Sequence, residues 1–341
     1  MRFIASTVCA TLLLAATQTD LAAAQNMRPP SLDTVQALGL DSVAGAATVY
    51  FRTRDRERAL GLHALLSEYL AFYRDLLGIQ TRMFVAVLDA EDWARVTNIP
   101  YGLPNSSGPG GANLLLAAAS PPAQVGARSL PRGRNGDLLT VGHEGGHLLT
   151  WELMPPDLKA GLSDPVEPPP DVMERLVRVG KVPAWYWEMA ANYFTTVFLA
   201  RVHPQDSSAW TEHLREITSI NRPRFTHLGN WFGRVLQASA PDSTPYVFST
   251  EGGLNQGWYQ GVVGFLAIHM HGESGTELIG HIRATLSGAS VSTTGQIVLQ
   301  LDSIANGASE LLTRLGASWA DSAANQSARP QPPAAAHRRA R

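Results

Sequence analysis

The sequence predicts an α+β protein in which a small α/β sheet module precedes a mainly helical part. Two observations carry this prediction. Before residue 120, short apolar runs typical of strands are separated by helical segments, whereas after residue 137 the apolar residues follow helical spacing. Hydrophobic residues make up 45% of the 341-residue chain and charged residues 16%, as is typical of globular proteins.

Three strands and two helices are expected in the sheet module. Residues 47–52 and 83–88 form short apolar runs, and residues 113–118 form a third. Apolar residues at three- and four-residue steps predict a helix over 55–77, and Asp89 opens a short helix that reaches residue 96. Gly, Pro, Asn and Ser are concentrated in residues 101–111 and predict a loop.

Helices dominate the expected structure after residue 137. One helix is predicted over 137–154, where Pro155 and Pro156 end it, and a second strong helix over 183–202, with a proline at its first turn. A Pro-rich connection over 155–171 and a short helix over 171–179 lie between them. Further helices are expected over the ranges 208–220, 253–270, 276–286, 293–304 and 309–321.

The first 24 residues have the pattern of a secretory signal peptide. A short positive start at Arg2 precedes an apolar run over 3–16, and small residues at 22–24 favour cleavage before Gln25. We therefore expect an exported protein, secreted or periplasmic, with an uncleaved N-terminal anchor as the alternative. The one cysteine, Cys9, lies in this segment, so that a metal site in the mature chain must use His, Asp or Glu.

The expected organisation is a signal peptide (1–24), the α/β module (25–136), the helical part (137–321) and a disordered tail (322–341) rich in Pro, Ala and Arg. No segment after the signal peptide reaches the length of a membrane-spanning helix. The 27 basic and 29 acidic residues give a formal net charge of -2, which argues against a nucleic-acid partner.

A metal-binding motif lies within the helix predicted over 137–154. Residues 141–147 read VGHEGGH and contain His-Glu-x-x-His. Since positions four residues apart share one face of a helix, His143 and His147 can direct two imidazoles at one ion, and neutral imidazole is a good zinc ligand. Glu144 is the candidate general base that activates a water molecule. Gly145 and Gly146 weaken the helix, but they also allow another backbone to approach closely.

Glu188 is the candidate third ligand. It is the only charged residue between Lys181 and Arg201, in an otherwise apolar helix. A carboxylate in such a helix is costly to bury unless a cation or metal pairs with it. The alternative is that Glu188 pairs with an arginine. The rival ligands lie among other polar residues or in the Pro-rich connection, and are Glu152, Asp164, Glu167, Asp171 and Glu174.

Asn192 follows Glu188 by one helical turn and shares its face. Its side-chain oxygen can accept the second ring N–H of a histidine ligand and so fix the tautomer of that histidine. The aromatic residues around these two positions, Trp185, Trp187, Tyr193 and Phe194, are expected to be core rather than a ligand cage.

On these residues, His143-Glu144-x-x-His147 followed by Glu188-x-x-x-Asn192, the chain resembles the gluzincin metallopeptidases, the thermolysin-like zincins. The resemblance implies a zincin-like fold, one zinc ion per chain held by the two histidines and Glu188, and Glu144 as the general base. It also implies that an edge strand, here residues 113–118, pairs with an extended substrate. The family usually has aspartate where this chain has Asn192.

The resemblance also suggests an oxyanion donor at the start of a later helix. Tyr259 is the candidate for that role, and His203 and His271 are the runners-up. A packed structural tyrosine is the alternative. The stretch 110–113, Gly-Gly-Ala-Asn, lacks the carboxylate that aminopeptidases of this type use to bind a free amine, which disfavours that specificity.

The sequence thus predicts an exported zinc-dependent metallopeptidase, a hydrolase whose partner is a peptide or protein substrate. Two alternatives remain open at this point. One is a binding protein on a degenerate, inactive zincin fold, and the other is a zinc hydrolase of a non-peptide substrate.

Overall fold

The computed structural model describes residues 30–98, 101–102, 114–118, 134–156, 159, 182–219, 223–230, 249–287 and 292–321. The predicted signal peptide, the short helix over 171–179 and the C-terminal tail lie outside these residues, as do most of the loop over 101–111 and of the Pro-rich connection. Within the described part, the architecture is mixed, with many helices and one small sheet, in agreement with the expected α+β class.

A four-stranded sheet forms the N-terminal module, in the order β1-β2-β3-β4. Strands β2 (Ala47–Phe51), β3 (Met83–Leu88) and β4 (Leu114–Ala117) are parallel and confirm the three predicted strands. Strand β1 (Asp41–Val43) pairs antiparallel with β2 and was not predicted. Its three residues are too few and too polar to show an apolar alternation.

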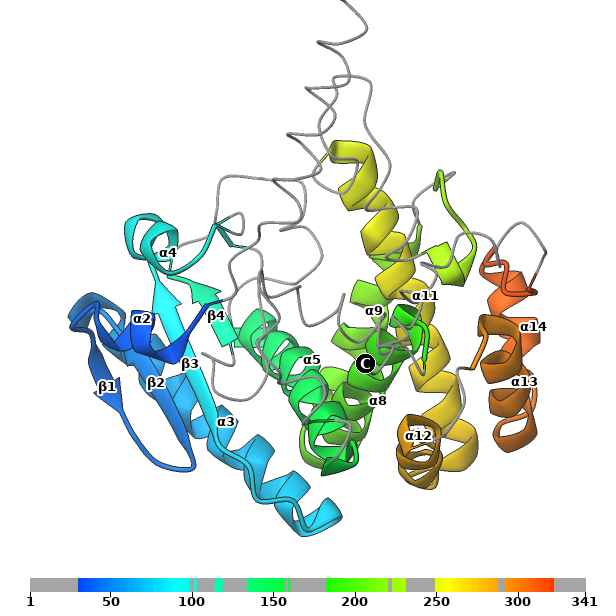
Figure 1. Ribbon diagram of the computed structural model, residues 1–341, viewed down its shortest axis with the longest axis horizontal. Coiled ribbons are helices and arrows are strands. Elements are labelled where there is room, and N and C mark those ends of the chain that lie inside the picture. The colour runs from blue at the N-terminus through cyan, green and yellow to red at the C-terminus, as the bar shows by residue number, and fades with distance from the viewer. Residues whose placement is uncertain are drawn as a thin grey trace, which may run out of the picture.

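Helices cover both faces of this sheet (Figure 1). The long helix α3 (Arg56–Leu77) follows the 3-10 turn Thr53–Asp55 and packs on the face formed by Val85 and Val87 of β3. The opposite face, with Ala86 and Leu88, packs against α2 (Leu32–Gln36) and α4 (Ala90–Val96). The alternation along β3 therefore buries both of its faces, which explains why its sequence is a continuous apolar run.

The helical part extends away from the sheet (Figure 1). It comprises α5 (Arg134–Leu153), α8 (Ala184–Val202), α9 (Ser207–Thr218), α11 (Thr250–Ser274), α12 (Leu278–Ser287), α13 (Thr294–Ile304) and α14 (Ala308–Arg314), with short 3-10 turns over Pro204–Asp206 and Leu228–Asn230. No helix in the described part of the chain has both the length and the apolar character that crossing a membrane requires.

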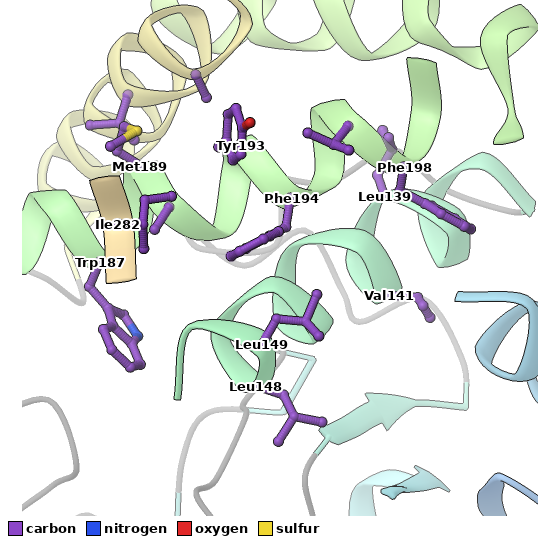
Figure 2. Close-up of a cluster of buried hydrophobic side chains, with 14 of the residues drawn as sticks. Leu139, Val141, Leu148, Leu149, Trp187, Met189, Tyr193, Phe194, Phe198 and Ile282 are labelled. Carbon is purple, nitrogen blue, oxygen red and sulfur yellow. The ribbon is translucent and has the colours of Figure 1, made fainter. Parts of the chain in front are cut away.

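Helix α8 is the centre of the helical part. It packs against α5 on one side and against α11 on another. Every residue from Trp185 to Leu199 is buried, so that α8 is apolar all round rather than amphipathic. Figure 2 shows α5 and α8 with buried side chains of both, among them Leu149 and Phe194. The expectation that the aromatic residues of this helix form core is confirmed.

The predicted helix over 309–321 is wrong in its second half. Helix α14 ends at Arg314, and Gly316 adopts a positive φ of 79°, which a helix does not contain. The chain then runs beside residues 226–228, where Ser318 forms a parallel bridge with His227. The helix ends before Gly316, and Ser318 pairs with His227, which lies 91 positions earlier in the chain.

Arg58 of α3 joins the sheet to the helix that carries the metal-binding motif. Its guanidinium donates to both carboxylate oxygens of Asp137, in the first turn of α5, at 2.7 and 3.0 Å. It also donates to the carbonyl oxygens of Ala117 and Ala118, at the end of β4. The hydrogen bonds to Asp137 raise the pKa of Arg58 against the effect of burial. One side chain therefore fixes α5 relative to the edge of the sheet.

Candidate metal centre

The two histidines of the motif lie on one face of α5, as predicted. The rings of His143 and His147 are 4.8 Å apart between centroids. His143 is buried, and His147 is nearly so, with its ring parallel to that of Trp187 at 6.1 Å. Trp187 thus forms an apolar wall beside the second imidazole.

Glu188 of α8 meets both histidines at a single oxygen. Its Oε2 atom is 3.3 Å from Nε2 of His143 and 3.5 Å from Nε2 of His147. Ligand atoms at about 2.0–2.1 Å from one tetrahedral ion are about 3.3 Å apart, since that is the edge of the tetrahedron. N–H···O hydrogen bonds, at about 2.7–3.2 Å, are shorter. The two distances from Glu188 Oε2 therefore suit ligands of a common ion, and all three ligand atoms lie within 4.8 Å of one another.

These three residues are the group that could hold a metal ion among the residues that the structure describes. Two imidazole nitrogens and one carboxylate oxygen suit zinc and other divalent first-row metals. The described residues supply no fourth ligand to a tetrahedral site, and catalytic zinc sites have such an open fourth position. The donor set therefore fits a metal ion, with zinc among the candidates.

Glu188 and the buried imidazole of His143 shift the pKa values of each other. Burial by itself lowers the pKa of His143, but the contact with Glu188 and its charge outweigh this effect and raise the pKa from 6.5 to about 9. Burial raises the pKa of Glu188, yet the two histidines together depress it well below its usual value. A metal cation would take the place of the proton on His143 beside the buried carboxylate.

Asn192 occupies the supporting position that the sequence predicted. Its side-chain oxygen lies 3.0 Å from Nδ1 of His143, and the residue is only 1% exposed. With Nδ1 as the donor, Nε2 of His143 keeps its lone pair for a metal.

Gln260 of α11 is a residue of this site that the sequence analysis missed. Its Nε2 atom donates to Oε2 of Glu188 at 2.8 Å, and its Oε1 atom accepts from Nδ2 of Asn192 at 3.2 Å. It belongs to neither motif, and it lies next to Tyr259, the residue that was selected on α11. The sequence signal that could have found it is a polar residue within an apolar helix.

The two motif glycines of α5 are sites of close packing, as expected. A Cβ atom on Gly146 would lie 2.5 Å from the carbonyl oxygen of Ala191 in α8. A Cβ atom on Gly145 would lie 2.6 Å from the ring of Tyr69 in α3. The missing Cβ atom of Gly146 lets α8 approach α5 closely enough for Glu188 to reach the histidines, whereas that of Gly145 makes room for Tyr69 of α3.

Glu144 lies on the helix between the two histidines in sequence. It is 7% exposed and has no hydrogen bond or ion pair with another residue in the described part of the chain. Its charge contributes to the raised pKa of His143, although by less than that of Glu188. Glu144 is therefore a largely buried carboxylate whose oxygens accept no hydrogen bond from the described residues.

Tyr259 is not brought to the three ligands as an oxyanion donor would be. It is 1% exposed, and its hydroxyl donates a hydrogen bond of 2.8 Å to the carbonyl oxygen of His227. The alternative of a packed structural tyrosine describes this placement. Of the runners-up, His203 contacts Glu68 at 2.9 Å, and His271 lies near Tyr193 with its pKa lowered by burial and by Arg201. Neither histidine joins the group of three.

The rival ligands do not join the group either. Glu152 forms an ion pair of 2.7 Å with Lys159. Asp164, Glu167, Asp171 and Glu174 lie outside the described residues.

The chain matches no protein-family model, no curated protein and no solved structure in the three comparisons with known proteins.

Proposed function

We propose that this protein is a zinc-dependent metallopeptidase of gluzincin type, with a zincin-like fold and one zinc ion per chain. The observation that supports it most is the convergence of His143, His147 and Glu188 on one point. The carboxylate of Glu144 lies on the same helix turn and has no partner among the described residues. The pattern of residues 1–24 supports export of the chain.

Zinc held by these three side chains would supply a Lewis acid that polarises a carbonyl group and makes water acidic enough to lose a proton near neutral pH. Glu144 accepts that proton at its carboxylate as the water oxygen bonds to the peptide carbon. It then gives the proton to the amide nitrogen as the C–N bond breaks, so that the products are a carboxyl and an amine. Its low exposure, and the lack of a competing partner among the described residues, keep this carboxylate available for both transfers.

A peptide substrate would bind in an extended form beside β4, the last strand in the described sheet. Strand β4 lies at the same end of the sheet that Arg58 ties to α5, so that a paired peptide would run near the helix carrying Glu144.

The experiment measures bound zinc and peptide cleavage in the wild type and in Glu144→Gln. We expect about one zinc per chain in both proteins and cleavage of a fluorogenic peptide library by the wild type alone. Glu152→Gln is the matched control, because it makes the same change on the same helix but at a residue paired with Lys159. Wild-type protein without zinc would overturn the proposal, and full cleavage by Glu144→Gln would remove Glu144 as the base.

A second candidate function is metal binding without turnover, by a binding protein on the same fold. The observation that favours it is the hydroxyl of Tyr259, which is already bonded to His227 and leaves the predicted oxyanion donor unfilled. It predicts stoichiometric zinc with no cleavage of any peptide. Hydrolysis of a non-peptide ester or amide by the same protein would instead support the third alternative, a zinc hydrolase of another substrate.

A further inference from the structure

Two side-chain amides connect two of the proposed metal ligands. From Glu188, the connection runs to Gln260 (2.8 Å), from Gln260 to Asn192 (3.2 Å) and from Asn192 to His143 (3.0 Å). Since Oε2 of Glu188 also lies 3.3 Å from Nε2 of His143, the four side chains form a closed ring. They come from three helices, α5, α8 and α11.

The direction of every hydrogen bond in this ring follows from Glu188. An ionised carboxylate can only accept, so the NH2 group of Gln260 must face it. The oxygen of Gln260 then faces Asn192 and requires the NH2 group of Asn192 as its donor. The oxygen of Asn192 is left for His143, whose Nδ1 must carry the hydrogen. Only this assignment satisfies all four groups.

We propose that Gln260 is a positioning residue for the metal, which acts through Asn192 to hold His143 with Nε2 free to bind an ion and directly to hold Oε2 of Glu188. This inference rests on the metal site of the proposed function, but not on peptide cleavage. Gln260 prepares both ligands before the metal binds, one through a direct hydrogen bond and one through a relay.

The ring also explains why position 192 holds asparagine. An aspartate there could still accept from His143, but it could not donate to the oxygen of Gln260. If Gln260 reversed its amide to suit an aspartate, its oxygen would face the oxygen of Glu188. One contact between two acceptors would remain in either case, and such contacts are costly because Glu188 and Asn192 are buried at 7% and 1% exposure.

The test measures the affinity for Zn2+ by competition with a chromogenic chelator, and the absorption spectrum of the Co2+-loaded protein. Gln260→Leu removes both hydrogen bonds, and we expect the Zn2+ affinity to fall roughly 10–100-fold, as for other residues that support metal ligands. Gln260→Glu should lower it further, because it places a second carboxylate against Glu188. In both variants the Co2+ spectrum should change, since the ligand Glu188 is no longer fixed.

Gln256→Leu is the matched control. Gln256 lies one turn earlier on α11, is half-buried like Gln260, and has no hydrogen bond to another residue that the structure describes. We expect the Zn2+ affinity and the Co2+ spectrum of this variant to equal those of the wild type. Circular dichroism of each metal-free variant checks that the fold is retained.

A double-mutant cycle distinguishes the relay from simple packing. Asn192→Asp should weaken Zn2+ binding in the wild type, where it faces the oxygen of Gln260. In the Gln260→Leu background that oxygen is gone, and the same change should leave Zn2+ affinity unchanged or raise it, since a carboxylate makes a histidine ligand more basic.

Equal losses from Asn192→Asp in both backgrounds would overturn the relay, and so would an unchanged affinity in Gln260→Leu. If the variants follow the expected order while no peptide is cleaved, the inference stands and the peptidase proposal fails. If the wild type binds neither Zn2+ nor Co2+, both are overturned.

Discussion

Gly146 of α5 lies directly against the backbone of Ala191 in α8. An added Cβ atom would be 2.5 Å from the carbonyl oxygen of Ala191 and 2.7 Å from its Cα atom. Both atoms belong to a backbone that cannot turn aside as a flexible side chain can. This contact sets the separation of the two helices at the level where His147 and Glu188 face each other.

Gly146→Ala should therefore destabilise the protein and weaken its metal site together. Alanine favours an isolated helix by about 1 kcal/mol over glycine, but the overlap with Ala191 forces α8 away from α5. We expect a lower melting temperature and a loss of Zn2+ affinity, measured by thermal unfolding and chelator competition.

Gly61→Ala is the control for this change. Gly61 lies within α3, and a Cβ atom there would meet no atom within 4 Å. The same substitution should leave Zn2+ affinity unchanged and raise stability by about 0.5–1 kcal/mol. A Gly146→Ala protein that behaves like Gly61→Ala would show that the helices are not in close contact at this position.

The metal-free protein should lose stability as the pH rises from 6.5 to 9. The pKa of His143 is raised from 6.5 to about 9, so the stability from its protonated form is complete below pH 6.5 and is lost as the pH passes 9. The depressed pKa of Glu188 acts in the opposite direction, with a contribution lost as the pH falls below 4.5. His143 and Glu188 therefore stabilise the metal-free fold most between pH 4.5 and pH 6.5.

Urea unfolding of the metal-free protein across this range measures the effect. The shift of His143 corresponds to an effect on the order of 3 kcal/mol. Glu188→Gln removes the charge that raises the pKa, so its stability should depend less on pH over the same interval. Zn2+ affinity should change in the reverse sense and increase up to about pH 9, because the metal competes with the proton on His143. An equally steep loss of stability in Glu188→Gln would contradict this account.

Removal of the metal should lower the melting temperature. A ligand that binds only the folded state stabilises it by about 4 kcal/mol at a concentration 1,000 times its dissociation constant. Wild-type protein with Zn2+ should therefore melt at a higher temperature than after treatment with a chelator. His147→Ala should show little difference between the two conditions, whereas His269→Ala, which alters a histidine bonded to the carbonyl of Asn306, should behave as the wild type does.

Arg58→Met should destabilise the junction between the sheet and α5. It removes the two hydrogen bonds to Asp137 and those to the end of β4, and hydrogen bonds between charged groups contribute about 1.5–3 kcal/mol when they are partly shielded from water. Arg74→Met is the matched control, because the pair of Arg74 with Asp75 is exposed and should contribute little. Chemical denaturation of both variants tests the difference, and equal stabilities would show that Arg58 does not join the two parts.

Much of the fold could be predicted from local patterns. The strands over 47–51, 83–88 and 114–117 and the helices α3, α5 and α8 lie within a few residues of the predicted ranges. Each has an apolar spacing that a single segment displays without its partners. Strand β1 could not be predicted in this way, because its pairing with β2 determines it. The end of α14 was missed although Gly316 is a local stop signal, and the pairing of Ser318 with His227 follows that stop.

The residues of the candidate site also divide into those that a single segment predicts and those that depend on tertiary packing. His143, His147 and Glu188 were selected from a four-residue spacing on one helix and from a lone acid on another, both of which are properties of a single helix. Gln260 was missed and its neighbour Tyr259 selected, since one residue along α11 turns a side chain by about 100° and the sequence does not state which direction faces α8.

The sequence by itself thus specified α5 with His143 and His147, and α8 with Glu188. The packing of three helices decided that these groups converge on one oxygen of Glu188 and that Gln260 donates a hydrogen bond to the same oxygen. The physical reason is the range of the forces involved. Helical spacing depends on residues three or four positions apart, whereas the convergence depends on steric contacts such as that of Gly146 with Ala191, between atoms that only the folded chain brings together.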